Sequence, residues 1–172
     1  KERFQKEYSL SPYDSNILVS EIEIADFFEA VTKGRDPKIA ANWITGEFFA
    51  AMNKLGFNIV DSPITIDNFS KLIKLIEENV ISTRIAKDVF EIMLENNEDP
   101  EEIVEREGLK QVSDSGELEK IIDNIIANNP DQVEAVKLKP KLMGWFVGQV
   151  MKETNGKANP KLVNDLLNDK LN

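Results

Sequence analysis

The sequence contains neither cysteine nor histidine in its 172 residues. Without a thiol or an imidazole there can be no Cys or His nucleophile–base pair, no thiolate zinc site and no imidazole general base. Catalysis would have to depend on carboxylates, lysine, serine or threonine, and no convergent set of these is visible in the sequence. We therefore expect a non-catalytic chain with no metal or cofactor of its own. An enzyme that acts through Asp, Glu or Lys pairs is a rival interpretation.

Long hydrophobic runs are also missing. No apolar run approaches the roughly 18 residues of a membrane-spanning helix, so we expect no membrane partner. The start at Lys1 has neither an initiator Met nor the apolar core of a signal peptide, and we expect a piece of a longer protein. The absence of cysteine agrees with a reducing compartment, so we expect a cytoplasmic or organellar protein.

Charge is distributed unevenly along the chain. Residues 137–172 hold 7 Lys or Arg and 3 Asp or Glu, a net of +4, whereas residues 1–136 hold 14 and 28, a net of −14; the two sum to −10. An acidic protein that gathers its lysines in one segment presents a cationic face on which a polyanion can dock.

Amphipathic spacing and helix-start residues predict an all-α fold. The apolar residues at helical spacing belong to predicted helices of ~8–18 residues. Helices of this length have marginal stability alone in water, so packing must stabilise them. Turn residues without periodicity, from Val112 to Gly116, predict a boundary between a multi-helix domain at 1–112 and a small helical tail domain at 113–172. Ser20 and Glu23 have the spacing of a capping box. The other predicted starts are Asp36-Pro37, Thr65, Ser82, Asp99-Pro100, Pro130, Pro140 and Asn159-Pro160.

A dense acidic run follows the fourth predicted helix. A metal site or a basic partner is conceivable there, but acids at helix starts suit the helix dipole, and a solvated face is the favoured interpretation. The run comprises Glu91, Glu95, Glu98, Asp99, Glu101, Glu102, Glu105 and Glu107.

Glycines mark the helix that begins at Pro140. Gly144 and Gly148 lie four residues apart, which predicts close helix–helix approach with Trp145 and Phe146 in the core, in preference to base stacking by Trp145. Gly148 and Gly156 do not have the spacing of a Walker A loop, so the sequence does not predict a nucleotide site.

Lysines surround the turn that precedes the last predicted helix. Lys152, Lys157 and Lys161 straddle Gly156, and the helix start at Asn159 is expected to offer free backbone N–H groups, which attract phosphate. This turn is the candidate anion site.

The same segment carries a longer pattern of residues. It reads Gly148-Gln149-Val150-Met151-Lys152, Gly156-Lys157-Ala158-Asn159-Pro160, Val163, Asn164, Leu166 and Leu167. Upstream, the residues that go with it are Tyr13-Asp14, Asn42-Trp43, Ile81-Ser82, Ala86-Lys87, Val89-Phe90, Gly108-Leu109, Gln111, Ser113-Asp114 and Asn129-Pro130. Together they are similar to the C-terminus of the B subunit of the glutamyl-tRNA(Gln)/aspartyl-tRNA(Asn) amidotransferase, and the likeness extends over essentially the whole chain. It departs from the family at Val136–Lys141, before Gly144.

The resemblance implies a helical domain and a YqeY-like tail that hold tRNA(Gln) or tRNA(Asn), with no DNA partner. It implies that the catalytic domain, with ATP and Mg, and the contacts with the A and C subunits lie in another part of the full-length protein. Under this interpretation lysines neutralise phosphates, Gly156 lets RNA approach closely, and Asn159 presents N–H groups, while Gln149 reaches a sugar or base edge or makes a structural hydrogen bond. The expected tRNA-binding residues are Lys152, Lys157, Lys161, Gly156, Asn159, Gln149 and, more weakly, Lys141.

A protein–protein adaptor is the alternative from another class. It would dock through an acidic helical face or an exposed aromatic patch, would be indifferent to tRNA, and would be sensitive to changes at Glu101 or Glu105.

Overall fold

The computed structural model describes residues 1–112 and 115–171, and it is all-α over these ranges, as the sequence predicts. One isolated bridge is the only extended pairing in the described part of the chain. The chain divides into two compact units, Lys1–Gly108 and Leu109–Asn172. Their division lies four residues before the boundary expected from the sequence.

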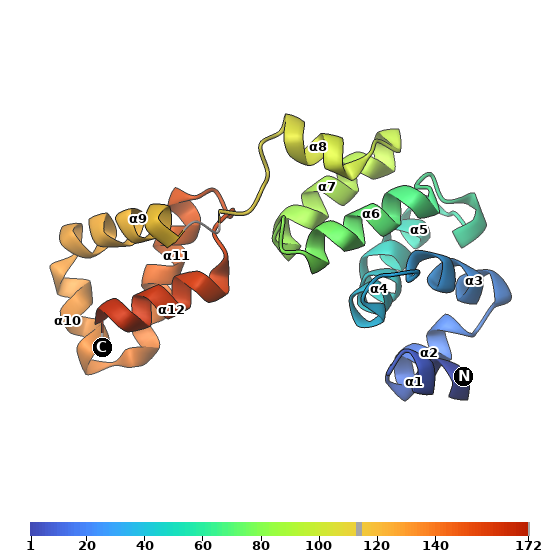
Figure 1. The fold of residues 1–172 in the computed structure, drawn as a ribbon, viewed down its shortest axis with the longest axis horizontal. Helices are drawn as coiled ribbons and strands as arrows, with labels where there is room; N and C mark the ends of the chain where they lie inside the picture. Colours follow the sequence, from blue (N-terminus) through green and yellow to red (C-terminus); the bar gives the residue numbers. More distant parts are fainter. Residues whose placement is uncertain (113–114, 172) are drawn as a thin grey trace. The chain divides into compact units, whose positions relative to one another are not determined.

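The first unit is a set of short helices (Figure 1). In chain order they are α1 (Glu2–Glu7), α2 (Pro12–Leu18), α3 (Ile22–Val31), α4 (Pro37–Trp43), η1 (Ile44–Phe48), α5 (Phe49–Leu55), η2 (Ile59–Asp61), α6 (Ile66–Glu77), α7 (Thr83–Asn96) and α8 (Pro100–Arg106).

Side-chain caps set the starts of α2, α4, α6, α7 and α8. The Asp36 carboxylate accepts the Lys38 and Ile39 N–H groups at 2.8 and 3.2 Å, with Pro37 at the first helical position. Thr65 and Ser82 cap α6 and α7 in the same way. The caps of α4, α6, α7 and α8 confirm the sequence prediction.

The capping box predicted at Ser20 is wrong. Helix α3 begins at Ile22 after Glu21, without a side-chain cap. The Ser20 hydroxyl instead donates to the Ile17 carbonyl at 2.8 Å, an acceptor at the end of α2 that also receives the Ser20 N–H at 3.2 Å. The Ser20 hydroxyl therefore bonds to the end of α2 and does not cap the start of α3.

The helix expected after Asp36 is interrupted by a π-helical segment, η1. The Thr45 hydroxyl donates back to the Ala41 carbonyl at 2.9 Å, which competes with the regular ladder, and Gly46 adds backbone freedom. The wider turn buries both Ile44 and Phe48.

Helix α6 is the centre of the first unit and contacts α3, α4, α7 and α8. Its Phe69 ring lies 5.0 Å from Phe48 and 6.1 Å from Phe90, centroid to centroid. Such aromatic packing adds to the burial of Leu72 and Ile73 on the same helix face.

The second unit is built around α11, which packs against both α9 and α12 (Figure 1). Its core includes Phe146 and Val150 from α11, together with Ile122 and Leu167 from the flanking helices. The helices are α9 (Ser115–Asn128), α10 (Pro130–Leu138), η3 (Pro140–Leu142), α11 (Met143–Glu153) and α12 (Pro160–Leu171).

Val112 explains why the second unit begins before the expected boundary. Its N–H donates to the Lys157 carbonyl at 2.7 Å, and its carbonyl accepts from the Asn159 N–H at 3.1 Å. This parallel bridge with Ala158 binds residue 112 to the second unit. The expected turn at Ser113-Asp114 lies outside the described residues.

Candidate nucleic-acid interface

The turn between α11 and α12 is a tightly hydrogen-bonded Schellman motif. After α11, Asn155 (φ 51°) and Gly156 (φ 77°) both adopt the left-handed conformation. The Gly156 N–H donates to the Met151 carbonyl at 2.7 Å, and the Asn155 N–H donates to the Lys152 carbonyl at 3.1 Å. The turn therefore has a fixed geometry before any ligand arrives.

Gly156 has a structural reason for being glycine. Its positive φ is strained for residues with a Cβ, and the residue is buried. This corrects the role expected from the sequence, because a buried Gly156 does not itself offer an open surface to RNA. It shapes the backbone on which Lys157 stands.

The start of α12 is already capped, which corrects the expectation of free N–H groups. Asn159 accepts the Lys161 and Leu162 N–H groups on its side-chain oxygen at 3.1 and 3.4 Å. Its own N–H donates to Val112, and Pro160 has no N–H to offer. Asn159 therefore orders the turn but does not present donors to a phosphate.

Lys157 lies in this turn, and Lys152 and Lys161 lie in the helices on either side of it. Lys152 is exposed in the last turn of α11, Lys157 is half-buried in the loop, and Lys161 is exposed in the first turn of α12. None of the three forms an ion pair with a carboxylate of the described residues. By contrast, Lys170 in the same unit lies 2.7 Å from Asp123.

Lys141 is separated from this group. It lies in η3, at the opposite end of α11 from Lys152. Eleven residues of helix extend about 16 Å, so the two lysines are at different ends of one helix. Lys152, Lys157 and Lys161 therefore flank the α11–α12 turn, and Lys141 does not.

The glycines of α11 are exposed, which corrects the expectation of close helix–helix approach. A Cβ built on Gly144 or on Gly148 would meet nothing within 4 Å. Gly144, Gly148 and Lys152 follow one another at four-residue intervals, so they share one side of α11. We call these three residues the α11 glycine face. The four-residue spacing of the glycines is visible in the sequence, but only the packing of α11 shows that they face the solvent.

The side chains beside this face differ in their engagement. Gln149 is half-buried and forms no hydrogen bond with the described residues, so its amide is not used structurally. Phe146 is fully buried, and its ring meets Trp145 edge-on at 5.0 Å. Trp145 packs against the core, which favours the structural interpretation over base stacking.

The net charges of the two units differ strongly. Residues 1–108 hold 12 Lys or Arg and 22 Asp or Glu, a net of −10, whereas residues 109–172 hold 9 of each, a net of zero. The second unit is therefore the more favourable one for a polyanion, because a polyanion near its lysines is repelled less by the surrounding carboxylates.

The acidic run of the first unit is partly committed to internal pairs. Asp99 lies 2.5 Å from Lys71 and caps α8, and Glu98 lies 2.6 Å from Arg106. Burial raises the pKa of Asp99, but hydrogen bonds from Lys71 and the Glu101 N–H outweigh it, so the pKa is lowered overall. No cluster of three or more acids in the described residues could hold a metal ion.

Comparison with known proteins shows which family has this sequence. A family model described as the GatB domain matches residues 26–171. The chain belongs to the GatB domain family. This confirms the resemblance that the tail pattern predicted.

The curated relatives of this GatB-domain chain have a common name, the B subunit of aspartyl/glutamyl-tRNA(Asn/Gln) amidotransferase. Those from Methylorubrum populi and Rhizobium meliloti are both 54% identical to it over 171 residues, or 99% of the chain. The match covers 35% and 34% of those two relatives, so the chain spans about a third of their length. Within the described residues, no helix has the length and apolarity needed to cross a bilayer.

Proposed function

We propose that this chain is the tRNA-binding, C-terminal part of the B subunit of an aspartyl/glutamyl-tRNA(Asn/Gln) amidotransferase. Its relatives bear that name, and the chain corresponds to about a third of each. Under this proposal the amidation chemistry, with ATP and Mg, and the contacts with the A and C subunits lie in the rest of the full-length protein. The chain itself contributes a grip on tRNA(Gln) or tRNA(Asn).

The observation that carries the proposal is the unpaired charge on the turn between α11 and α12. Lys152, Lys157 and Lys161 stand on a rigid turn and lack carboxylate partners in the described chain. An ion pair would have to be broken before a lysine could bind phosphate, and here none has to be. Rigid placement also limits the side-chain and loop ordering lost on binding.

The α11 glycine face complements this charge. Glycine in an exposed helix interior costs about 0.8–1.0 kcal/mol of stability relative to alanine, and nothing inside the unit requires it at Gly148. A bare helix surface next to Lys152 allows the sugar–phosphate backbone of RNA to approach the helix closely. Folded RNA is recognised mostly through shape and backbone, for which such a surface is suited.

The lysines of the α11–α12 turn and the α11 glycine face would have different roles in binding RNA. The three lysines neutralise phosphates, the α11 glycine face accommodates the RNA backbone, and Gln149 has a free amide for a sugar or base edge. Gly156 and Asn159 act by holding the turn, and Lys141 contributes from the other end of α11.

The experiment is a titration of tRNA against the chain at several salt concentrations, read by fluorescence anisotropy. Each lysine that displaces counterions contributes roughly 0.7–0.9 to the slope of log Kobs against log salt, so Lys157→Ala should flatten it by about that amount. Lys33→Ala, at an exposed lysine of the first unit that has no ion pair with the described residues, is the matched control and should leave the slope unchanged. Equal slopes for Lys157→Ala and the unmodified chain would contradict the proposal.

A further inference from the structure

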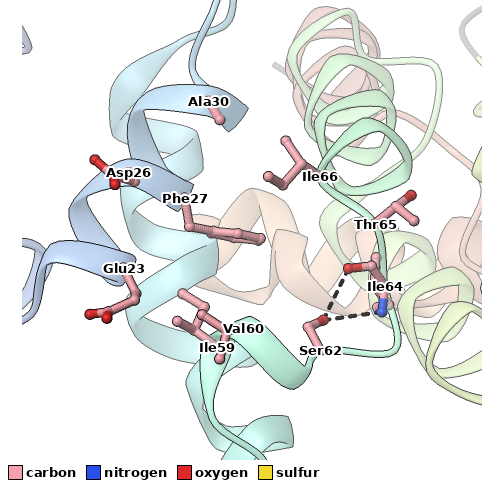
Figure 2. A pocket seen from close by; sticks show the side chains of 10 residues that line it. All are labelled: Glu23, Asp26, Phe27, Ala30, Ile59, Val60, Ser62, Ile64, Thr65 and Ile66. Atoms are coloured by element: carbon pink, nitrogen blue, oxygen red, sulfur yellow. Dashed lines mark hydrogen bonds between the residues drawn. The ribbon is translucent and has the colours of Figure 1, made fainter.

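A groove in the first unit lies between α3 and the segment that leads into α6 (Figure 2). Its volume is about 620 Å³. The Phe27 ring projects from α3 into the gap, and Ile59, Val60 and Ile66 line the other sides. The interior of the groove is thus formed mainly by apolar side chains.

Several of these apolar side chains are unusually exposed. Val60 is 69% and Ile66 is 44% exposed, and Ile22, which does not line the groove but precedes the lining residue Asp26 by four positions on α3, is 76% exposed. Scattered exposed hydrophobics are normal in soluble proteins, but a group of them at one groove is typical of an interaction site. Covering them would remove apolar area from water.

The neutral polar groups of the groove are already satisfied. The Ser62 hydroxyl donates to the Ile64 carbonyl at 3.0 Å and accepts the Ile64 N–H at 3.1 Å. The Thr65 hydroxyl oxygen accepts the Asn68 N–H at 3.3 Å. The carboxylates at the rim are therefore the polar groups with binding capacity to spare.

Those carboxylates have one sign and little internal compensation. The residues that line the groove include two acids, Glu23 and Asp26, and no Lys or Arg. The neighbouring sequence, residues 20–31 and 57–70, contains six acids in all. Glu29 pairs with Arg3 and Asp67 with Lys71, while the remaining four have no ion pair with the described residues. The four are Glu21, Glu23, Asp26 and Asp61.

We propose that this groove binds a cationic amphipathic segment of a partner protein, with apolar anchors on one face and Lys or Arg beside them. Apolar anchors would enter beside Phe27 and Val60, and the cations would meet Glu23 and Asp26. Helix-in-groove recognition has this combination of features. RNA would be repelled by the acids, and a second copy docked through the same groove would bring like charges together.

The test uses a synthetic amphipathic peptide of about 14 residues with Leu at helical spacing and Lys on the flanks. Titration into the ¹⁵N-labelled chain should shift amide signals from residues 22–30 and 59–66. A peptide of the same composition with scrambled order, and one with Glu in place of Lys, should cause no such shifts. Raising the salt from about 50 to about 500 mM should weaken binding, because exposed charges are screened.

The double variant Glu23→Lys/Asp26→Lys should weaken peptide binding by at least about tenfold at low salt, since attraction becomes repulsion. The matched control is Glu77→Lys/Glu78→Lys, which makes the same charge change at the far end of α6, at exposed acids that pair with no cation of the described chain. It should bind the peptide nearly as the unmodified chain does. These side chains are outside the core, so both variants should fold normally. Unchanged dispersion of the other amide signals would verify this.

Three outcomes would overturn the proposal. The peptide could bind equally well to the groove variant and to the control variant. The signals of the groove could shift on addition of tRNA instead of peptide. The chain alone could form a dimer that Val60→Asp abolishes, which would assign the groove to a second copy. The first and third outcomes leave the lysines of the α11–α12 turn untouched. The second would count against those lysines as well only if tRNA shifted the signals of residues 1–108 alone, so failure of this proposal and failure of the proposed function can be told apart.

Discussion

Gly148→Ala adds a single methyl group and should change the stability of the fold and the affinity for tRNA in opposite directions. The residue is exposed in the interior of α11, has an ordinary helical φ, and a Cβ there would meet nothing within 4 Å. Alanine should therefore stabilise the helix by about 0.8–1.0 kcal/mol. For a unit of this size, about 1 kcal/mol raises the melting midpoint by roughly 4–8 °C.

The same methyl group should weaken tRNA binding if RNA rests on the α11 glycine face. Overfilling a close contact costs about 1–3 kcal/mol, which corresponds to a loss of affinity of roughly 5- to 150-fold. The two effects have opposite signs, so reduced folding cannot account for reduced binding. Thermal unfolding gives the first quantity and anisotropy with labelled tRNA gives the second.

A control variant distinguishes a local effect from a general one. Asn124→Ala, at an exposed position of α9 whose side chain bonds to nothing in the part of the chain that the structure describes, should also gain some helix stability and should leave tRNA affinity unchanged. Gly144→Ala should behave like Gly148→Ala. If both glycine variants are more stable and bind tRNA as tightly as the unmodified chain, the glycine face has no role in RNA binding.

Three further predictions concern the fold. Asn159→Ala should lower the free energy of unfolding by about 1 kcal/mol in a urea titration, because two N–H groups of α12 lose their cap. Phe69→Ala, in the core around α6, should lower it by about 3–5 kcal/mol, and a drop below about 1 kcal/mol would contradict the packing. The pKa of Asp99 in the folded chain is below the ordinary 3.8, so its contribution to stability is present above that pH and is lost as the pH falls through the folded pKa. Asp99→Asn retains a capping oxygen but no ion pair with Lys71, and should therefore flatten the acid branch of a stability–pH curve.

Helix starts could be predicted from the sequence where a single residue decides them. Asp36-Pro37 and Asp99-Pro100 combine a capping carboxylate with a proline that needs no hydrogen bond, and both are confirmed. The capping box predicted at Ser20 is wrong because the Ser20 hydroxyl bonds to the end of α2 and is not available to the start of α3. The π-helical segment at Ile44–Phe48 was missed because its spacing suits an ordinary helix as well.

The candidate site could be predicted only in part. The lysines of the α11–α12 turn are neighbours in sequence, so their proximity follows from a short turn. Whether Gly144 and Gly148 face a helix or the solvent depends on how α11 packs against α9 and α12. The engagement of the Asn159 N–H by Val112 depends on a pairing across more than forty residues, which no local pattern reveals.

An NMR titration of the ¹⁵N-labelled chain with unlabelled tRNA tests the central claim most directly. The account predicts that the largest amide shifts fall between Gly144 and Lys161, around the α11 glycine face and the lysine turn. Shifts confined to residues 1–108, or their absence at saturating tRNA, would contradict it.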